Sequence, residues 1–205
     1  MYTQENDSKF PRLGNSPSGP PMDWRAELED FYSTERKIFF CPMTTKTLAE
    51  GAQPKYAITV DAIWGRTSSY AANRWILYPF VRAGHSAVNL RYWGTTNVPN
   101  AYRTPVMGDS CWWHRGYSEP NDTPPEYDGQ PPTGTGSDGM RIYCIDRHNG
   151  AINILFMDWS ARKVGLKELW TLKWSRDYDT AGPWTRTGGV APVDWPQWMR
   201  KLKDY

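Results

Sequence analysis

The sequence predicts an α+β fold in which short helices flank one side of an antiparallel sheet. Short apolar runs of strand length alternate with tight-turn residues, above all in residues 141–165. Brief helical stripes of apolar residues follow that region. Glycine and proline number 17 each among 205 residues, which indicates long irregular connections between short elements. This length suits one domain with a substantial core, or at most two small ones, and we expect a single domain over 22–205.

The first half of the chain carries only brief elements. Residues 1–21 are polar and rich in proline, serine and glycine, so we expect an extended segment. Asp23 suits the N-cap of a helix over 24–32, in which Trp24, Leu28 and Phe31 share one face. The other expected elements are an apolar run at 37–41, a helical turn within 44–53, strands near 56–59 and 106–109, and an ordered passage at 67–82 beside the sheet.

Residues 114–139 predict a long surface loop, because proline, glycine and polar residues dominate and apolar ones are scarce. Loops of this length are usually functional or disordered. The acidic residues within 114–139 offer the carboxylate oxygens that calcium prefers, although their spacing in the sequence is not that of an EF-hand. A solvated acidic loop is therefore the favoured interpretation and calcium binding the alternative. The acids concerned are Glu119, Asp122, Glu126, Asp128 and Asp138.

Residues 141–165 predict three short strands joined by two tight turns. Asn149 and Gly150 both tolerate the positive φ of a type I′ turn, which makes this pair a strong hairpin signal. The run 151–157 has apolar residues on both alternating faces and suits a strand covered on both sides. Nine residues separate His148 from Asp158.

Two further helices are expected after the strands. One begins at Leu166 and ends near Asp177, with Leu169, Trp170 and Trp174 on one face. The last begins at an Asp194 N-cap, with Pro196 in its first turn and Gln197 at the capping-box position. Its apolar stripe consists of Trp195, Trp198, Met199 and Leu202.

Composition excludes several classes of function. A net charge of +2 with no long basic run gives no electrostatic footprint for nucleic acid. Three widely spaced cysteines, Cys41, Cys111 and Cys144, argue against a zinc site of paired thiolates and allow one disulfide at most. The sequence has no apolar stretch of bilayer-spanning length. GxSxG, HExxH and phosphate-binding glycine loops are absent, so we expect a non-enzymatic protein. A hydrolase with two facing carboxylates is the enzymatic alternative.

Several segments together resemble the His-X9-Asp-Gly C-terminal domain of prepilin-type proteins, relatives of the type II secretion pseudopilins. His148, Asn149, Gly150 and Asp158 match its motif, and other segments lie in the order and approximate places that the family uses. Trp159 follows Asp158 where the family has glycine, so we expect a turn that avoids a glycine-only conformation. The further matching segments are Phe-Phe-Cys-Pro at 39–42, Ser-Tyr-Ala-Ala-Asn at 69–73, Pro-Val-Met-Gly-Asp at 105–109, and residues 163–170.

The resemblance implies a pilin-like globular head and a role in assembly. Family members begin with a prepilin leader and an apolar anchor helix, and residues 1–7 look like the end of that helix and the loop after it. We therefore expect the anchor to be missing from this sequence; the alternative is that the protein never had one. Implied partners are other pilin-like subunits, the secretion machinery and secreted cargo, in the cell envelope on its periplasmic or extracellular side.

Two candidate sites follow from individual side chains. A His148–Asp158 dyad would be catalytic, but an extended strand of seven residues would separate its members by about 25 Å. We therefore expect both to serve local turns. The second site is a carbohydrate-binding or adhesive surface, the alternative function, since aromatic faces stack on sugar rings. Its candidates are the aromatic residues in loop-like segments: Tyr92, Trp93, Trp112, Trp113 and Trp184.

Overall fold

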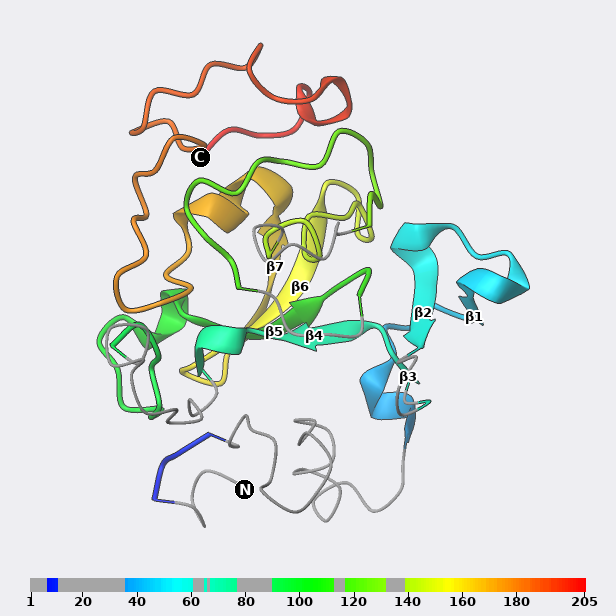
Figure 1. The fold of residues 1–205 in the computed structure, drawn as a ribbon, viewed down its shortest axis with the longest axis horizontal. Coiled ribbons are helices and arrows are strands. Elements are labelled where there is room, and N and C mark those ends of the chain that lie inside the picture. The colour runs from blue at the N-terminus through cyan, green and yellow to red at the C-terminus, as the bar shows by residue number, and fades with distance from the viewer. Residues whose placement is uncertain are drawn as a thin grey trace, which may run out of the picture.

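Two sheets of unequal size organise the chain (Figure 1). The computed structural model describes residues 7–10, 36–60, 65, 67–76, 90–112, 117–131 and 139–205. The expected helix over 24–32, most of the extended segment 1–21, Trp113 and Asp138 lie outside these ranges. No helix within the described ranges is long and apolar enough to cross a bilayer.

The larger sheet has four antiparallel strands in the order β4-β5-β6-β7. They are β4 Tyr70–Ala72, β5 Pro105–Asp109, β6 Ala151–Phe156 and β7 Ala161–Gly165. Strand β6 buries Ile152, Ile154 and Phe156 on one face, as the alternation predicts. The expectation that both faces are covered holds only in part. On the other face Met157 is buried and Leu155 is half-buried, whereas Asn153 is exposed.

The smaller sheet joins three short strands, β1 Lys46–Thr47, β2 Ala57–Val60 and β3 Thr67–Ser68. Strands β1 and β2 are parallel, whereas β2 and β3 are antiparallel. Figure 1 places this sheet beside the end of β4, to which β3 connects through Ser69. The expected strands at 56–59 and 106–109 are confirmed as β2 and β5, within one residue.

Helical structure in the described residues consists of short 3₁₀ segments. They are η2 Arg36–Phe39, η3 Leu48–Glu50, η4 Pro54–Tyr56, η5 Arg74–Ile76, η6 Ala101–Arg103, η7 Leu166–Thr171 and η8 Gln197–Met199. The α+β prediction therefore holds coarsely, as an antiparallel sheet with brief helical turns. The turn expected within 44–53 is η3, closed by a capping box between Thr47 and Glu50.

Both predicted C-terminal helices are much shorter in the structure. The first ends at Thr171, because the backbone N–H of Lys173 donates to the carbonyl of Arg103, 2.9 Å away, instead of continuing the helix. In the second, Asp194 accepts from the N–H of Ala191 at 2.8 Å and so closes the preceding turn. A tertiary contact outweighs the local helical pattern in the first helix, and a local turn takes up the predicted N-cap residue in the second. The chain after η7 runs as irregular coil around one side of the sheet (orange to red in Figure 1).

The first of the three strands predicted over 141–165 does not form. The N–H groups of Tyr143 and Cys144 both donate to the carbonyl of Met140, which coils this segment into a turn. The carbonyl of Ile142 accepts from Cys111 instead of from a neighbouring strand. Residues 142–145 are nevertheless buried, which explains their strand-like apolar composition.

The two tight turns of the region do form. Asn149 and Gly150 have φ of 55° and 75°, as a type I′ turn requires. At the β6–β7 turn, Trp159 adopts a positive φ of 67°, which is uncommon for a residue other than glycine. Asp158 builds this turn by accepting from Ser160 N and Oγ at 3.0 and 2.6 Å. These hydrogen bonds lower the pKa of Asp158.

Replacing Trp159 with glycine should leave the protein about 1 kcal/mol more stable than replacing it with alanine. Both substitutions remove the indole ring, which is 42% exposed and packs on Phe10. The two variants differ in the free-energy cost of the left-handed backbone conformation at position 159, which alanine pays and glycine does not. Urea denaturation of the two variants measures this difference, and an alanine variant as stable as the glycine variant would contradict the turn geometry.

Tryptophan indoles tie the irregular segments to the core. Trp75, Trp170 and Trp198 donate to the carbonyls of Ser118, Asp122 and Pro125, at 3.2, 2.9 and 2.9 Å. The described part of the loop 114–139 is therefore packed against the core and only partly exposed, which corrects the expectation of a surface loop. An indole presents a large apolar surface together with one donor, which suits it to bury beside irregular backbone.

Candidate functional site

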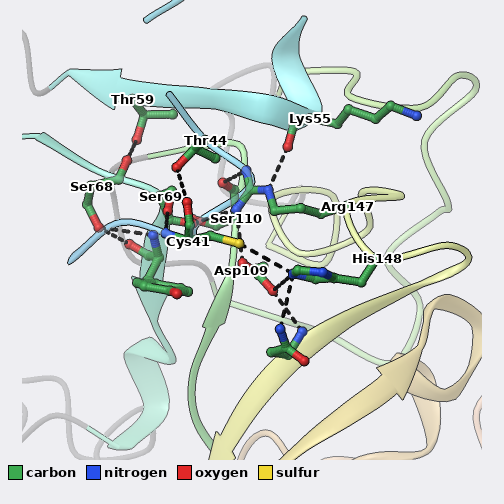
Figure 2. A network of polar contacts seen from close by, with 12 residues as sticks. Cys41, Thr44, Lys55, Thr59, Ser68, Ser69, Asp109, Ser110, Arg147 and His148 are labelled. Atoms are coloured by element: carbon green, nitrogen blue, oxygen red, sulfur yellow. Dashed lines mark hydrogen bonds and ion pairs between the residues drawn. The ribbon is translucent and has the colours of Figure 1, made fainter. Parts of the chain in front are cut away.

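Segments from four parts of the chain meet at one buried polar cluster, formed by Cys41, Asp109, Arg147 and His148 (Figure 2). Cys41 follows η2, Asp109 ends β5, and Arg147 and His148 precede the turn into β6. The fourth segment contributes Ser69, between β3 and β4, through its backbone. We call these four side chains the polar cluster.

Arg147 is the centre of the cluster's hydrogen bonds. Its guanidinium donates to three backbone carbonyls, those of Lys55, Ser69 and Ser110, at 2.6, 2.8 and 2.8 Å. It also forms an ion pair with Asp109, with 3.2 Å between Nη1 and Oδ1. Both side chains are 0% exposed. A buried ion pair of this kind is tolerated because each charge is satisfied by its partner and by further hydrogen bonds.

The second oxygen of Asp109 faces His148 and the backbone of β6. Oδ2 lies 3.1 Å from His148 Nε2 and accepts from the backbone N–H of Asn153 at 2.7 Å. Asp109 thus joins the guanidinium on one side to the imidazole on the other. The His148 side chain is 20% exposed, which makes it the member of the cluster nearest to solvent.

Cys41 completes the cluster with its thiol, which lies 3.4 Å from His148 Nε2. The residue is 1% exposed. Burial is the main reason that the pKa of the Cys41 thiol rises to about 11, and the nearby Asp109 carboxylate contributes to the rise. The thiol is therefore protonated at neutral pH.

The arrangement differs from that of a nucleophilic Cys-His-Asp triad. In a triad the carboxylate orients the imidazole from the ring nitrogen opposite the nucleophile. Here Asp109 and Cys41 both contact Nε2 of His148. A reactive cysteine also needs a lowered thiol pKa, whereas that of Cys41 is raised. Three ligand-bearing side chains instead converge on one point.

The structure gives the predicted motif residues different roles. Asp158 serves its own turn, as expected. His148 was expected to serve only its own turn, but its ring also contacts Cys41, Asp109 and Asn153. None of these contacts joins His148 to Asp158, and Asn149 and Gly150 form the turn between the polar cluster and β6.

The predicted aromatic binding residues do not assemble a surface platform. Tyr92 and Trp93 are 7% and 6% exposed and belong to the core. Trp184 is partly buried and packs against Trp195, with ring centroids 5.3 Å apart. Of the four that the structure describes, Trp112 is the most exposed, at 36%. These rings were assigned to the surface because their segments are irregular, yet irregular segments enter the core of this fold.

The described loop acids engage separate partners rather than a common site. Asp122 caps the N–H groups of Glu119 and Met140. Glu119 pairs with Arg91 at 2.6 Å and Asp128 with Lys55 at 2.7 Å. Across the described ranges, the one group of three or more His, Cys, Asp or Glu residues with converging ligand atoms is Cys41, Asp109 and His148. The calcium alternative therefore finds no assembled ligand set among the described acids.

Sequence reasoning singled out His148 but missed its partners. Cys41 is 107 residues away and Asp109 is 39, so no local spacing connects them. Both nevertheless lie in segments on which the expected resemblance rests, 39–42 and 105–109. Comparison of the chain with protein-family models, with curated proteins and with solved structures finds no match.

Proposed function

We propose that this chain is the globular head of a non-enzymatic, pilin-like subunit associated with type II secretion or with a type IV pilus-like filament. Its work is assembly: the head faces outward from the cell envelope and contacts neighbouring subunits, the secretion machinery or secreted cargo. An anchoring helix that precedes the head would hold the subunit in the membrane before assembly.

The observation that carries the proposal is the meeting of the family-like segments at one place. Cys41, Ser69, Asp109 and His148 come from four of the five separate segments on which the resemblance rests: 39–42, 69–73, 105–109 and 148–158. Segments that are far apart in the sequence have a common structural role when their contacts with one another stabilise the fold. The buried Arg147–Asp109 ion pair, in which the guanidinium also binds backbone carbonyls, provides such contacts.

Two further features agree with an assembly role. The family-like spacing from His148 to Asp158 contains β6, at the interior of an antiparallel sheet, so the motif frames the domain. The polar cluster also lacks the relay geometry and the activated thiol that covalent catalysis needs. Both features favour a structural subunit over an enzyme with a cysteine nucleophile.

Cell fractionation tests this proposal. In the bacterium that encodes the chain, antibodies against the head should detect it in the envelope and in filaments sheared from the surface, and deletion of the prepilin peptidase should remove it from the sheared material. A cytosolic enzyme serves as the lysis control. Detection of the chain with that enzyme alone, unchanged by the deletion, would overturn the proposal.

A further inference from the structure

The polar cluster contains a set of ligand atoms that fits a transition-metal ion. We propose that Cys41, Asp109 and His148 bind one divalent zinc-like ion through Sγ, Oδ2 and Nε2. This inference does not depend on the proposed function, because it rests on the geometry of the cluster alone. The three ligand atoms lie within 4.8 Å of one another.

The separations between the ligand atoms match those around tetrahedral zinc. Zinc lies about 2.3 Å from a thiolate and about 2.0–2.2 Å from imidazole nitrogen or carboxylate oxygen. Tetrahedral angles then place sulfur about 3.5 Å from nitrogen, and nitrogen about 3.4 Å from oxygen. The observed distances are 3.4 Å from Cys41 Sγ to His148 Nε2 and 3.1 Å from Nε2 to Asp109 Oδ2. These two separations differ from the tetrahedral values by a few tenths of an ångström or less, and the third, between Cys41 Sγ and the Asp109 carboxylate, is within 4.8 Å.

Hydrogen bonding alone accounts poorly for the crowding around His148 Nε2. This one nitrogen lies within 3.4 Å of the Cys41 thiol, the Asp109 carboxylate and the side-chain nitrogen of Asn153. A ring nitrogen offers either one proton or one lone pair, so it serves one of these neighbours at a time. A cation between the nitrogen, oxygen and sulfur would be contacted by all three ligands at once.

The surroundings hold the ligands as metal sites require. Arg147 fixes Asp109 through Oδ1, and the backbone N–H of Asn153 donates to the liganding oxygen Oδ2. Such outer contacts orient ligands and tune their affinity. Binding of the ion displaces the thiol proton of Cys41 to solvent. The thiolate, the Asp109 carboxylate, Arg147 and the divalent ion then carry one net positive charge together. The mixed sulfur, nitrogen and oxygen set favours zinc over calcium or magnesium, which take oxygen ligands.

Three protein ligands leave a fourth coordination position for water or an external ligand. The 20% exposure of His148 indicates from which side that position is reached, because Cys41 and Asp109 are buried. Figure 2 shows the thiol, the carboxylate and the imidazole pointing toward one another from different strands and loops. A bound ion would thereby join segments 107 residues apart in the sequence.

Metal titration of the whole chain tests the site. Metal-free, reduced protein should bind one Zn²⁺ per chain with a Kd of about 1 μM or tighter in calorimetry at neutral pH. Co²⁺ should give the intense near-ultraviolet band of a thiolate ligand and visible bands typical of tetrahedral coordination. Cys41→Ser should abolish the thiolate band, and His148→Gln should weaken Zn²⁺ binding at least about tenfold.

Matched controls come from the chain's other cysteines and histidines. Cys111→Ser removes a buried thiol outside the cluster, and His114→Gln removes a histidine outside the described residues; both variants should bind as the parent does. Zn²⁺ should also protect Cys41 from slow alkylation in the unsubstituted protein, which needs no variant to fold. Absence of stoichiometric binding, a thiolate band that survives Cys41→Ser, or protection of Cys111 instead of Cys41 would overturn the site.

Discussion

Replacing Arg147 with methionine should lower the free energy of unfolding by about 3–5 kcal/mol. Methionine keeps much of the side-chain length but removes every donor. The Asp109 charge would then remain buried without its partner, and the carbonyls of Lys55, Ser69 and Ser110 would lose their shared donor. Both effects act at the point where the family-like segments meet, so the loss should be cooperative and global.

Urea denaturation followed by tryptophan fluorescence measures this loss. Arg186→Met is the matched control, because Arg186 is exposed, and it should change stability by less than about 0.5 kcal/mol. Adding Asp109→Asn to Arg147→Met should recover part of the loss, since the unpaired buried charge disappears. A single variant within about 1 kcal/mol of the parent would show that the cluster does not fasten the fold.

Replacing Trp170 with alanine should cost about 3–5 kcal/mol, the range for a fully buried large aromatic. Trp170 is 0% exposed and packs edge-to-face on Trp195, with ring centroids 5.4 Å apart. Its indole also donates to the carbonyl of Asp122 at 2.9 Å, which holds the long loop against the core. The substitution therefore removes ring packing and leaves a buried carbonyl without its donor.

Two comparison variants separate these contributions. Trp170→Phe keeps most of the ring packing and loses the hydrogen bond, so it should cost less than alanine by at least about 1 kcal/mol. Trp112→Ala removes a ring that is 36% exposed and should cost well under half as much as Trp170→Ala. Equal losses at Trp112 and Trp170 in urea denaturation would contradict the assignment of the core.

The sequence predicted the parts of the fold that depend on neighbouring residues. Asn149 and Gly150 determine their turn by backbone preference alone, and β6 follows from the alternation of Ile152, Ile154 and Phe156. The first of the two C-terminal helices is shorter than predicted because distant backbone ends it: Lys173 donates to Arg103, 70 residues earlier. A short periodic run cannot reveal such a competing partner.

The candidate site was predictable only in fragments. His148 stands out beside its turn, whereas Cys41 is one of three widely spaced cysteines and Asp109 is the last residue of a predicted strand. Their meeting depends on the order β4-β5-β6 in the sheet and on the packing of the chain after η2 beside Ser69. Neither pairing leaves a local spacing in the sequence, so the cluster becomes visible only in three dimensions.

The structure also gives the high tryptophan content a different explanation from the one that the sequence suggests. Loop aromatics suggested a sugar-binding surface, yet several indoles are buried donors to backbone carbonyls. An irregular chain has many carbonyls that no strand or helix pairs, and a buried indole satisfies one while adding apolar area. Five tryptophans in the described ranges are explained in this way: Trp75, Trp93, Trp170, Trp174 and Trp198.

Cross-linking within sheared surface material tests the proposed role of the head most directly. Surface fractions from the organism that encodes the chain would be cross-linked, the chain recovered with its antibody, and its partners identified by mass spectrometry. The head of a pilin-like subunit should be linked to proteins that carry a prepilin leader, and these links should disappear when the prepilin peptidase is deleted. Links to cytosolic proteins alone, or a chain absent from the surface material, would contradict that role.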